Sequence, residues 1–282
     1  MDLGFALRST VFKPLEASLV AQELPAFSYF FVPDVSNDVD PLMVALSVLM
    51  KRDDCRAGPG VIRIFEHQLN NISKQINTIE QLTNNRFFLG VGTGSAEGNS
   101  SDIIKRFAET INTLHSVNQD LEIYAAALRE GMAKGVAKVA NGIIINFSTF
   151  SHAKRMASAF KNGGGKRVFS YLKVFISWNK ERAQAMAAEE ISRYNLLAQY
   201  KALFEKEKII NDIKNINEDF KLIRTLQEKG VLLVNPSKSE IKFAITVFMK
   251  NGVDVPVIYP YFSSNYSTNE KLEQIKKLFN DT

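Results

Sequence analysis

The segment FFLGVGTGSAEGN, residues 87–99, is an apolar run that ends among glycines and small polar residues. Gly90, Gly92 and Gly94 stand at alternate positions in it. Bare backbone of this kind suits either a tight turn or the close approach of a flat or anionic molecule. The stretches AGPGVI and AAAL end two other apolar runs in the same way. If the three ends are neighbours, they leave a slot for a flat ring that touches backbone N–H and C=O groups.

Charged residues stand beside these run ends. Asp34 closes the apolar run FSYFFVPD, and Glu66 follows AGPGVI. Their carboxyl groups are the candidate catalytic partners for the polar edge of a bound ring. The competing interpretations are a turn or helix-capping acid for Asp34 and a solvated loop acid for Glu66.

The residues after AAAL suit an anion such as phosphate. A predicted helix follows Arg129, and its first N–H groups and positive dipole end favour a negative charge. The alternative for all of these run ends is ordinary packing with turn glycines. Whether these run ends lie close together depends on the strands and helices that carry them.

Composition argues against several other kinds of site. The single cysteine, Cys55, allows no internal disulfide and fits a reducing cytoplasm. His67, His115 and His152 are far apart and lack cysteine partners, so no metal site is expected. The net charge of +5 comes from scattered residues, so we expect no nucleic-acid partner. We also expect no membrane partner, because the chain shows neither a signal-peptide pattern nor an apolar stretch of about 20 residues.

Strand and helix patterns alternate along the chain. Eight short apolar runs predict strands at 3–7, 27–34, 55–62, 87–94, 122–128, 142–147, 169–177 and 255–262. Amphipathic patterns predict helices at 14–24, 40–51, 68–82, 101–116, 130–140, 151–161 and 237–250. This alternation predicts an α/β fold, a single (β/α)8 TIM-barrel domain over residues 1–282. An open Rossmann-like sheet is the rival, but its glycine-rich fingerprint would follow the first strand rather than the fourth.

The alternation breaks between the seventh and eighth strands. Residues 180–235 are rich in Glu, Lys and Asn and read as helical. They predict a helical insertion at the C-terminal end of strand seven, the end of such barrels that carries the active site. The insertion is expected to cap the barrel, to form a wall of the substrate pocket, or both.

Several of these segments resemble one superfamily. NNRFFLGVGTGS resembles the strand-four signature of the bacterial-luciferase-like flavin and deazaflavin proteins, and YAAALREGMAKGVAKVANGIIINF resembles their unit of strands five and six. AGPGVIRIFEH and VPDVSNDVD are similar to the branch of methylenetetrahydromethanopterin reductases. The resemblance reaches NGVDVPVIYP and so covers nearly the whole chain. It implies a (β/α)8 barrel with coenzyme F420 or FMN lying across the strand ends.

The resemblance also implies which residues form the site. A cis peptide between Gly60 and Val61 would lie behind the central ring, and Asp34 would lie near the polar edge of the ring. The further positions implied to contact the cofactor are Gly92, Thr93, Gly94, Ser95 and Ala127, with the backbone of Arg129, Glu130, Gly131 and Met132 at the phosphate.

The chain departs from the superfamily pattern at several points. Val35 stands where a histidine commonly follows the acid of strand two. Arg129 and Glu130 replace the usual Gly-Pro of the phosphate loop; the arginine would attract a phosphate and the glutamate would repel it. Asn141 replaces the acid of an Ala-Asp-Gly turn, and only SVNQ precedes strand five, where relatives carry a longer excursion.

Three functions follow from the resemblance. The first is an F420-dependent oxidoreductase that transfers a hydride between the deazaflavin and a small or pterin-like substrate. The second is an FMN-dependent monooxygenase or reductase, which the loss of the histidine after Asp34 disfavours. The third is a flavin-binding or structural relative without catalysis, which the altered phosphate loop favours. The resemblance also implies a homodimer.

Overall fold

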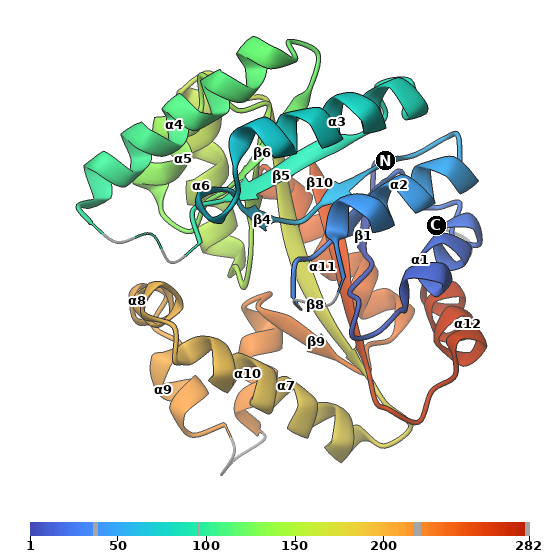
Figure 1. The fold of residues 1–282 in the computed structure, drawn as a ribbon. Coiled ribbons are helices and arrows are strands. Elements are labelled where there is room, and N and C mark those ends of the chain that lie inside the picture. Colours follow the sequence, from blue (N-terminus) through green and yellow to red (C-terminus); the bar gives the residue numbers. More distant parts are fainter. Residues whose placement is uncertain (36–38, 95, 97, 217–220, 280–282) are drawn as a thin grey trace.

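The predicted barrel is present (Figure 1). The computed structural model describes residues 1–35, 39–94, 96, 98–216 and 221–279. The strands are β1 (Gly4–Ala6), β2 (Tyr29–Val32), β3 (Arg56–Pro59), β4 (Ile62–Arg63), β5 (Phe88–Gly92), β6 (Glu122–Ala126), β7 (Gly142–Ile145), β8 (Arg167–Ile176), β9 (Leu232–Val234) and β10 (Val255–Phe262). Because β3 and β4 are two halves of one barrel strand and β9 pairs only with β8, the eight expected barrel strands remain.

All strand pairs are parallel, in the order β3-β2-β1-β10-β8-β7-β6-β5-β4. An isolated bridge between Ala57 and Phe87 joins β3 to the start of β5 and closes the ring. The carboxyl ends of all barrel strands therefore meet at one end of the barrel, which we call the mouth.

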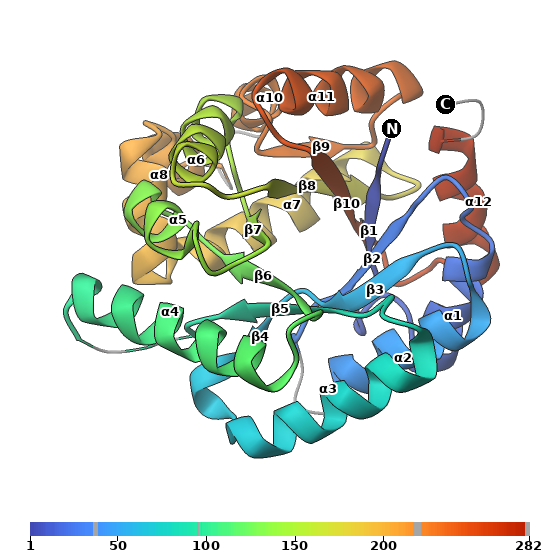
Figure 2. The same cartoon turned by 90° about the horizontal axis from the view of Figure 1, so that it is seen from above.

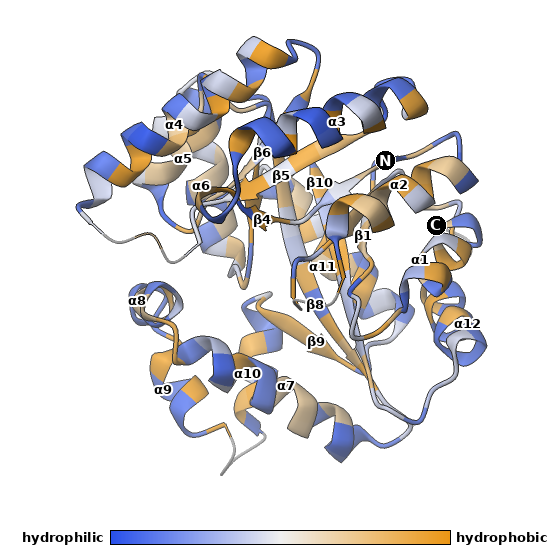
Figure 3. Cartoon of the chain, in the orientation of Figure 1, coloured by the Kyte–Doolittle hydropathy of each residue, from blue (hydrophilic) through white to orange (hydrophobic). Residues whose placement is uncertain are grey.

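The helices surround the strands, as the view in Figure 2 shows. They are α1 (Pro14–Gln22), α2 (Pro41–Lys51), α3 (Leu69–Thr83), α4 (Ser100–Val117), α5 (Glu130–Val136), α6 (Phe150–Asn162), α11 (Lys238–Lys250) and α12 (Thr268–Phe279). Side-chain caps begin several of them, with Asp40 on α2, Asn99 on α4, Thr149 on α6 and Ser237 on α11. The strands are largely hydrophobic, whereas the helices carry polar residues on part of their surface (Figure 3). Within the described ranges, no helix combines the length and hydropathy needed to cross a bilayer.

One helix is shorter than expected, and one helix was not expected. The helix predicted over 130–140 ends at Val136, because the chain turns there to begin β7. Asn141 fixes that turn: its Oδ1 accepts from the Ile123 N–H at 2.8 Å, and its own N–H donates to the Ile123 carbonyl at 2.9 Å. The sequence analysis did not predict helix α12. This segment is mostly polar, and its buried residues are Ile275 and Phe279.

The helical insertion between β8 and β10 is confirmed. It comprises α7 (Lys180–Asn195), α8 (Ala198–Lys206), α9 (Ile210–Lys214) and α10 (Lys221–Glu228), which gather at the lower part of Figure 1. Its last residues form the strand β9 rather than a helix. Strand β9 pairs with the C-terminal half of the long strand β8. Apolar residues of the insertion share one buried cluster with the side chains inside the barrel. The insertion therefore covers the mouth.

Aromatic rings fill the barrel. The ring centroids of Phe31 and Phe88 are 4.7 Å apart, those of Phe88 and Tyr124 are 4.9 Å apart, and those of Tyr124 and Phe169 are 4.5 Å apart. Tyr171 continues this stack toward the mouth, with its ring centroid 5.8 Å from that of Phe31. These large rings fix the spacing of the strands whose ends carry the candidate site.

Candidate functional site

The break between β3 and β4 lies at the mouth. The peptide bond between Gly60 and Val61 is cis, as the resemblance implies. The Gly60 N–H donates to the Val32 carbonyl at 2.8 Å, and the Gly60 carbonyl accepts from Tyr171 Oη at 2.8 Å. A Cβ at Gly60 would lie 2.2 Å from that Oη, so the position admits no side chain. Strands β2 and β8 thus hold this break from both sides.

Contacts within the protein explain the glycines in and just after strand β5. A Cβ at Gly90 would lie 2.0 Å from the Pro59 carbonyl oxygen, and one at Gly92 would lie 2.9 Å from Val61 Cγ2. Gly94 has a φ of +61°, and a Cβ there would lie 3.0 Å from Glu66 Oε1. The third barrel strand and the residues after it press against β5 at all three positions. Their close approach accounts for the alternate glycines without any bound molecule.

A surface of small residues remains where β4, β5 and β6 end. The Cβ position of Gly92 lies next to both Val61 and the Ala126 methyl group, the latter at 3.4 Å. We call Val61, Gly92 and Ala126 the ledge. Val61 and Ala126 are half-buried, as are the neighbouring Thr93 and Gly94. The ledge fits the flat ring system of a flavin or deazaflavin, because no side chain larger than valine stands on it.

Ala127 is placed differently from the other predicted contacts. Strand alternation turns Ala126 toward the barrel interior with Tyr124, whereas Ala127 is buried in the cluster between strands and helices. Its N–H donates to the Ile144 carbonyl at 3.1 Å. Ala126 therefore lies on the ledge, and its neighbour Ala127 does not. Ser95, another predicted contact, lies outside the described residues.

The two predicted acids meet around an arginine that the sequence analysis did not single out. Arg63, at the end of β4, lies 3.7 Å from the Asp34 carboxylate and 3.1 Å from that of Glu66. The Asp34 side chain is only 13% exposed, and that of Glu66 is 48% exposed. Burial raises the pKa of Asp34 above its ordinary value, although Arg63 and His67 act in the opposite direction. Asp34 is therefore the better placed of the two to hold or release a proton beside the ledge.

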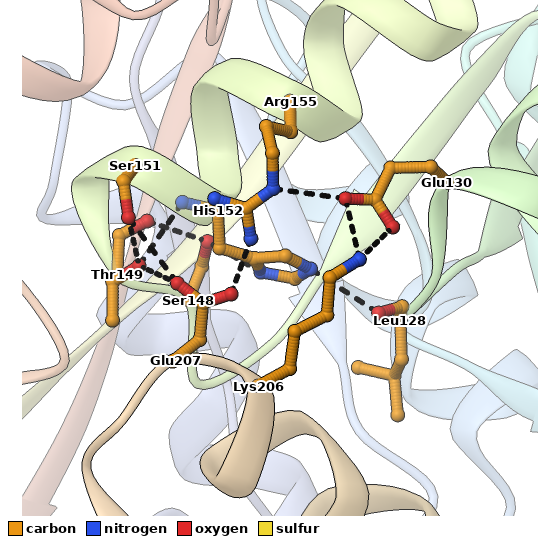
Figure 4. Close-up of polar contacts among 9 residues, drawn as sticks. All are labelled: Leu128, Glu130, Ser148, Thr149, Ser151, His152, Arg155, Lys206 and Glu207. Carbon is orange, nitrogen blue, oxygen red and sulfur yellow. Dashed lines mark hydrogen bonds and ion pairs between the residues drawn. The ribbon is translucent and has the colours of Figure 1, made fainter.

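The predicted phosphate end is organised by ion pairs. The Glu130 carboxylate binds Arg155 Nε at 2.9 Å and Lys206 Nζ at 2.7 Å (Figure 4). Burial opposes its ionisation, but hydrogen bonds from Lys206, the backbone and Arg155 lower the pKa of Glu130 to about 2. The expected repulsion of a phosphate by Glu130 is thus offset by two cations. The side chain of Arg129 is exposed and forms no hydrogen bond or ion pair with the described residues.

Two further residues were expected at the phosphate. Gly131 is exposed and has open space around its Cα, whereas Met132 is half-buried against the outer core. The open backbone at Gly131 leaves room for a ligand there. Met132 can contribute only its backbone.

Polar contacts attach the insertion to the mouth (Figure 4). The Glu207 carboxylate, 3% exposed, binds Arg155 and accepts from Thr149 Oγ1 at 2.6 Å. Beneath it, His152 Nδ1 lies 3.0 Å from Ser148 Oγ, and Nε2 lies 3.1 Å from the Leu128 carbonyl. Because Nε2 must donate to that carbonyl, Nδ1 accepts from Ser148. This buried network holds the ends of β6 and β7 against α6 and the residues after α8.

Two cavities lie away from the mouth. One of about 420 Å³ lies between α1 and α2, and one of about 270 Å³ lies beside Asp2, Cys55 and Arg86 at the opposite end of the barrel. In the described ranges, no group of three or more His, Cys, Asp or Glu side chains could hold a metal ion. The ledge and the acids around Arg63 therefore remain the candidate site.

No protein-family model matches the chain, and no curated protein matches it by sequence. Solved structures match over almost its whole length. The coenzyme F420-dependent tetrahydromethanopterin reductase from Methanopyrus kandleri has a TM-score of 0.67 and 16% identity, covering 98% of this chain and 97% of the other. An F420-dependent secondary alcohol dehydrogenase in complex with an F420-acetone adduct has a TM-score of 0.70 and 9% identity, covering 99% of each chain.

A structure that contains FMN matches over a similar length. The oxygenating constituent of 3,6-diketocamphane monooxygenase from Pseudomonas putida, in complex with FMN, has a TM-score of 0.65 and 10% identity, covering 98% of this chain and 96% of the other. The chain therefore has the fold shared by these F420-dependent and FMN-containing enzymes, as the resemblance in its sequence implies.

Proposed function

We propose that this chain is a luciferase-like oxidoreductase that binds coenzyme F420 at the mouth of the barrel. The observation that carries the proposal is the ledge of Val61, Gly92 and Ala126 beside the cis peptide. Fold similarity to F420-dependent and FMN-containing enzymes supports the choice of cofactor class. We further propose that the protein acts as a homodimer, as the resemblance implies.

The residues of the mouth have distinct roles in this proposal. The ledge holds the ring on a flat apolar surface, and Asp34 holds a proton at its carboxyl group beside the polar edge of the ring. The insertion excludes water from the reacting atoms. When bound, F420 supplies or accepts the hydride. The substrate is a small or pterin-like molecule.

The backbone of Glu130, Gly131 and Met132 and the side chain of Arg129 would hold the cofactor phosphate. Because the Arg129 guanidinium has no partner among the described residues, it is available to an anion. A charge-assisted hydrogen bond contributes roughly 1.5–3 kcal/mol, so Arg129→Ala should weaken cofactor binding by about one to two powers of ten. High salt should weaken binding by the wild type further. Equal affinities of Arg129→Ala and wild type would show that the arginine plays no part.

The test of the ledge is a binding titration of F420 and of FMN, followed by the absorbance of the bound cofactor. Ala126→Phe places a ring on the ledge and should abolish binding. Ala159→Phe makes the same change at a half-buried alanine on α6, outside the barrel, and should leave binding intact. Unchanged binding by Ala126→Phe would contradict the proposed position of the ring.

Two alternatives have specific support. FMN in place of F420 is supported by the similarity to the FMN complex. A relative without catalysis is supported by Arg129 and Glu130, which replace the usual Gly-Pro of the phosphate loop. Preference for FMN in the titration would establish the first alternative, and binding of neither cofactor would favour the second.

A further inference from the structure

Two basic side chains at the mouth carry buried nitrogen atoms without a hydrogen-bond acceptor among the described residues. Lys173 on β8 is 0% exposed, and its Nζ has no acceptor among the described residues. The Nε atom of Arg8, which follows β1, is also buried and has no acceptor among these residues, although the Arg8 side chain as a whole is 13% exposed. We call Lys173 and Arg8 the donor pair. Buried donors are normally satisfied, so two such atoms in one region require an explanation.

Aromatic rings surround Lys173 without offering it an acceptor. Strand alternation turns it into the barrel between Tyr171 and Phe175. Its Nζ lies over the rings of Tyr259, Phe147, Tyr171, Tyr261 and Tyr194, at 3.2, 5.0, 5.4, 5.6 and 5.9 Å from the ring centroids. Ring faces attract a cation but do not replace the hydrogen bonds that an ammonium group makes in water.

Both members of the donor pair border the same tyrosine. The Arg8 guanidinium carbon lies 4.7 Å from the centroid of the Tyr261 ring, against 5.6 Å for Lys173 Nζ. Tyr171, which also borders Lys173, donates to the Gly60 carbonyl beside the ledge. A single tyrosine therefore separates the donor pair from the site proposed for the ring.

The acid in this region is already engaged. Glu190 of α7 accepts from Tyr261 Oη at 2.7 Å and binds Arg193 through both carboxylate oxygens at 2.8 Å. Its distance to Arg8 Nη2 is 3.9 Å. Among the described residues, the charges that act on Lys173 are those of Glu190, Arg8 and Arg193. Arg8 and Arg193 thus share one carboxylate, which leaves one positive charge unbalanced even when Lys173 is neutral.

We propose that the donor pair binds an oxyanion, a carboxylate or phosphate group of the substrate, between β8, β1 and the insertion. This inference rests on the proposed function, because it assigns the substrate of the same mouth to an anionic class. The oxyanion would accept hydrogen bonds from Lys173 Nζ and Arg8 Nε, the two atoms that lack acceptors. Helix α7, which supplies Glu190, Arg193 and Tyr194, forms the outer wall of the site.

Binding should be coupled to proton uptake. Burial lowers the pKa of Lys173 well below its ordinary value, so the empty site favours the neutral amine. An adjacent oxyanion favours the ammonium form, and the proton comes from solvent. Anion affinity should therefore fall as the pH rises. The other titratable groups that border Lys173 are Tyr171, Tyr194, Tyr259 and Tyr261, whose pKa values burial raises.

The test uses inorganic phosphate and acetate as separate probes, on the full chain without cofactor. Thermal unfolding is followed as each anion replaces chloride at constant ionic strength, because a ligand that binds the folded state raises the unfolding temperature saturably. Calorimetry in buffers of different ionisation enthalpy then measures proton uptake. A response to acetate alone identifies a carboxylate site, a response to phosphate alone identifies a phosphate site, and either supports the proposal.

Substitutions locate the response. Arg8→Gln and Lys173→Met should each weaken anion binding about ten- to hundredfold, the loss of one charge-assisted hydrogen bond. Arg182→Gln and Lys180→Met make the same changes at exposed residues in the first turn of α7 and should bind as the wild type does. Arg8→Gln keeps the proposal testable if Lys173→Met fails to fold.

The proposal is overturned if neither anion stabilises the wild type beyond chloride, or if Arg8→Gln binds as tightly as the wild type. Because the titration contains no cofactor, its outcome is separate from that of the F420 and FMN titrations. Anion binding without cofactor binding would leave the site in place and refute the proposed oxidoreductase. Cofactor binding without anion binding would support the proposed oxidoreductase and refute the anion site.

Discussion

Replacing Lys173 by methionine should stabilise the protein. Methionine has similar length and suits the surrounding aromatic rings. The substitution removes a fully buried amine without an acceptor, a group whose burial costs about 1–3 kcal/mol in proteins. Wild type also bears the cost of keeping Lys173 deprotonated at neutral pH. We therefore expect Lys173→Met to raise the free energy of unfolding at neutral pH by about 2 kcal/mol or more.

The pH dependence tests the cause. The pKa of Lys173 is lowered in the folded state, so between the folded and unfolded pKa values the unfolded chain binds one more proton. In that window the stability of the wild type rises with pH by about 1.4 kcal/mol per unit, whereas Lys173→Met lacks this contribution. The advantage of the variant should shrink as the pH approaches about 10, the ordinary lysine value.

Urea unfolding of both proteins across this pH range measures the difference. Lys180→Met, at an exposed position of α7, is the control and should change stability by less than about 0.5 kcal/mol. A less stable Lys173→Met, or an advantage that does not vary with pH, would refute the account of Lys173 as a buried amine without a partner. The stabilised variant should also lose anion binding, as expected where a functional group is kept at a cost in stability.

Three more substitutions test the architecture of the mouth. Gly90→Ala should destabilise the protein by about 2 kcal/mol or more, because the new Cβ would meet the Pro59 carbonyl oxygen at 2.0 Å. Gly131→Ala in α5, where nothing lies within 4 Å of the new Cβ, should stabilise by about 0.5–1 kcal/mol in the same thermal unfolding assay. Glu207→Gln should cost about 1–2 kcal/mol, less than for a fully buried pair because Arg155 is 40% exposed. It should also speed proteolysis near α8, and a cleavage rate equal to that of the wild type would show that Glu207 does not hold the insertion.

The sequence by itself determined the barrel and its insertion. Each strand is a local apolar run, and the helices between strands repeat their apolar residues at helical spacing, so both signals lie within a few neighbouring residues. The sequence did not predict the strand β9 or the helix α12, which has a polar composition. Strand β9 has only three residues and is defined by its pairing with β8, which no local pattern reveals.

The sequence determined only part of the candidate site. The sequence pointed to Asp34, Glu66 and the glycines of β5, but their relation depends on contacts between separate strands. Arg63 joins the two acids only because β2 and β4 end together at the mouth. Likewise, the bare backbone of β5 is explained by the third strand pressing on it, a close approach that appears only when the barrel closes.

Charge pairing was decided by the tertiary structure alone. Glu130 is neutralised by Arg155 and Lys206, which are 25 and 76 residues away along the chain, so its own neighbours suggested repulsion of phosphate instead. Lys173 could have been noticed, because FSYLKVF places one lysine in a row of alternating aromatic residues. That its amine lacks an acceptor depends on every group that packs around it, since hydrogen bonding inside the barrel is set by side chains brought together from β8, β10, β1 and α7.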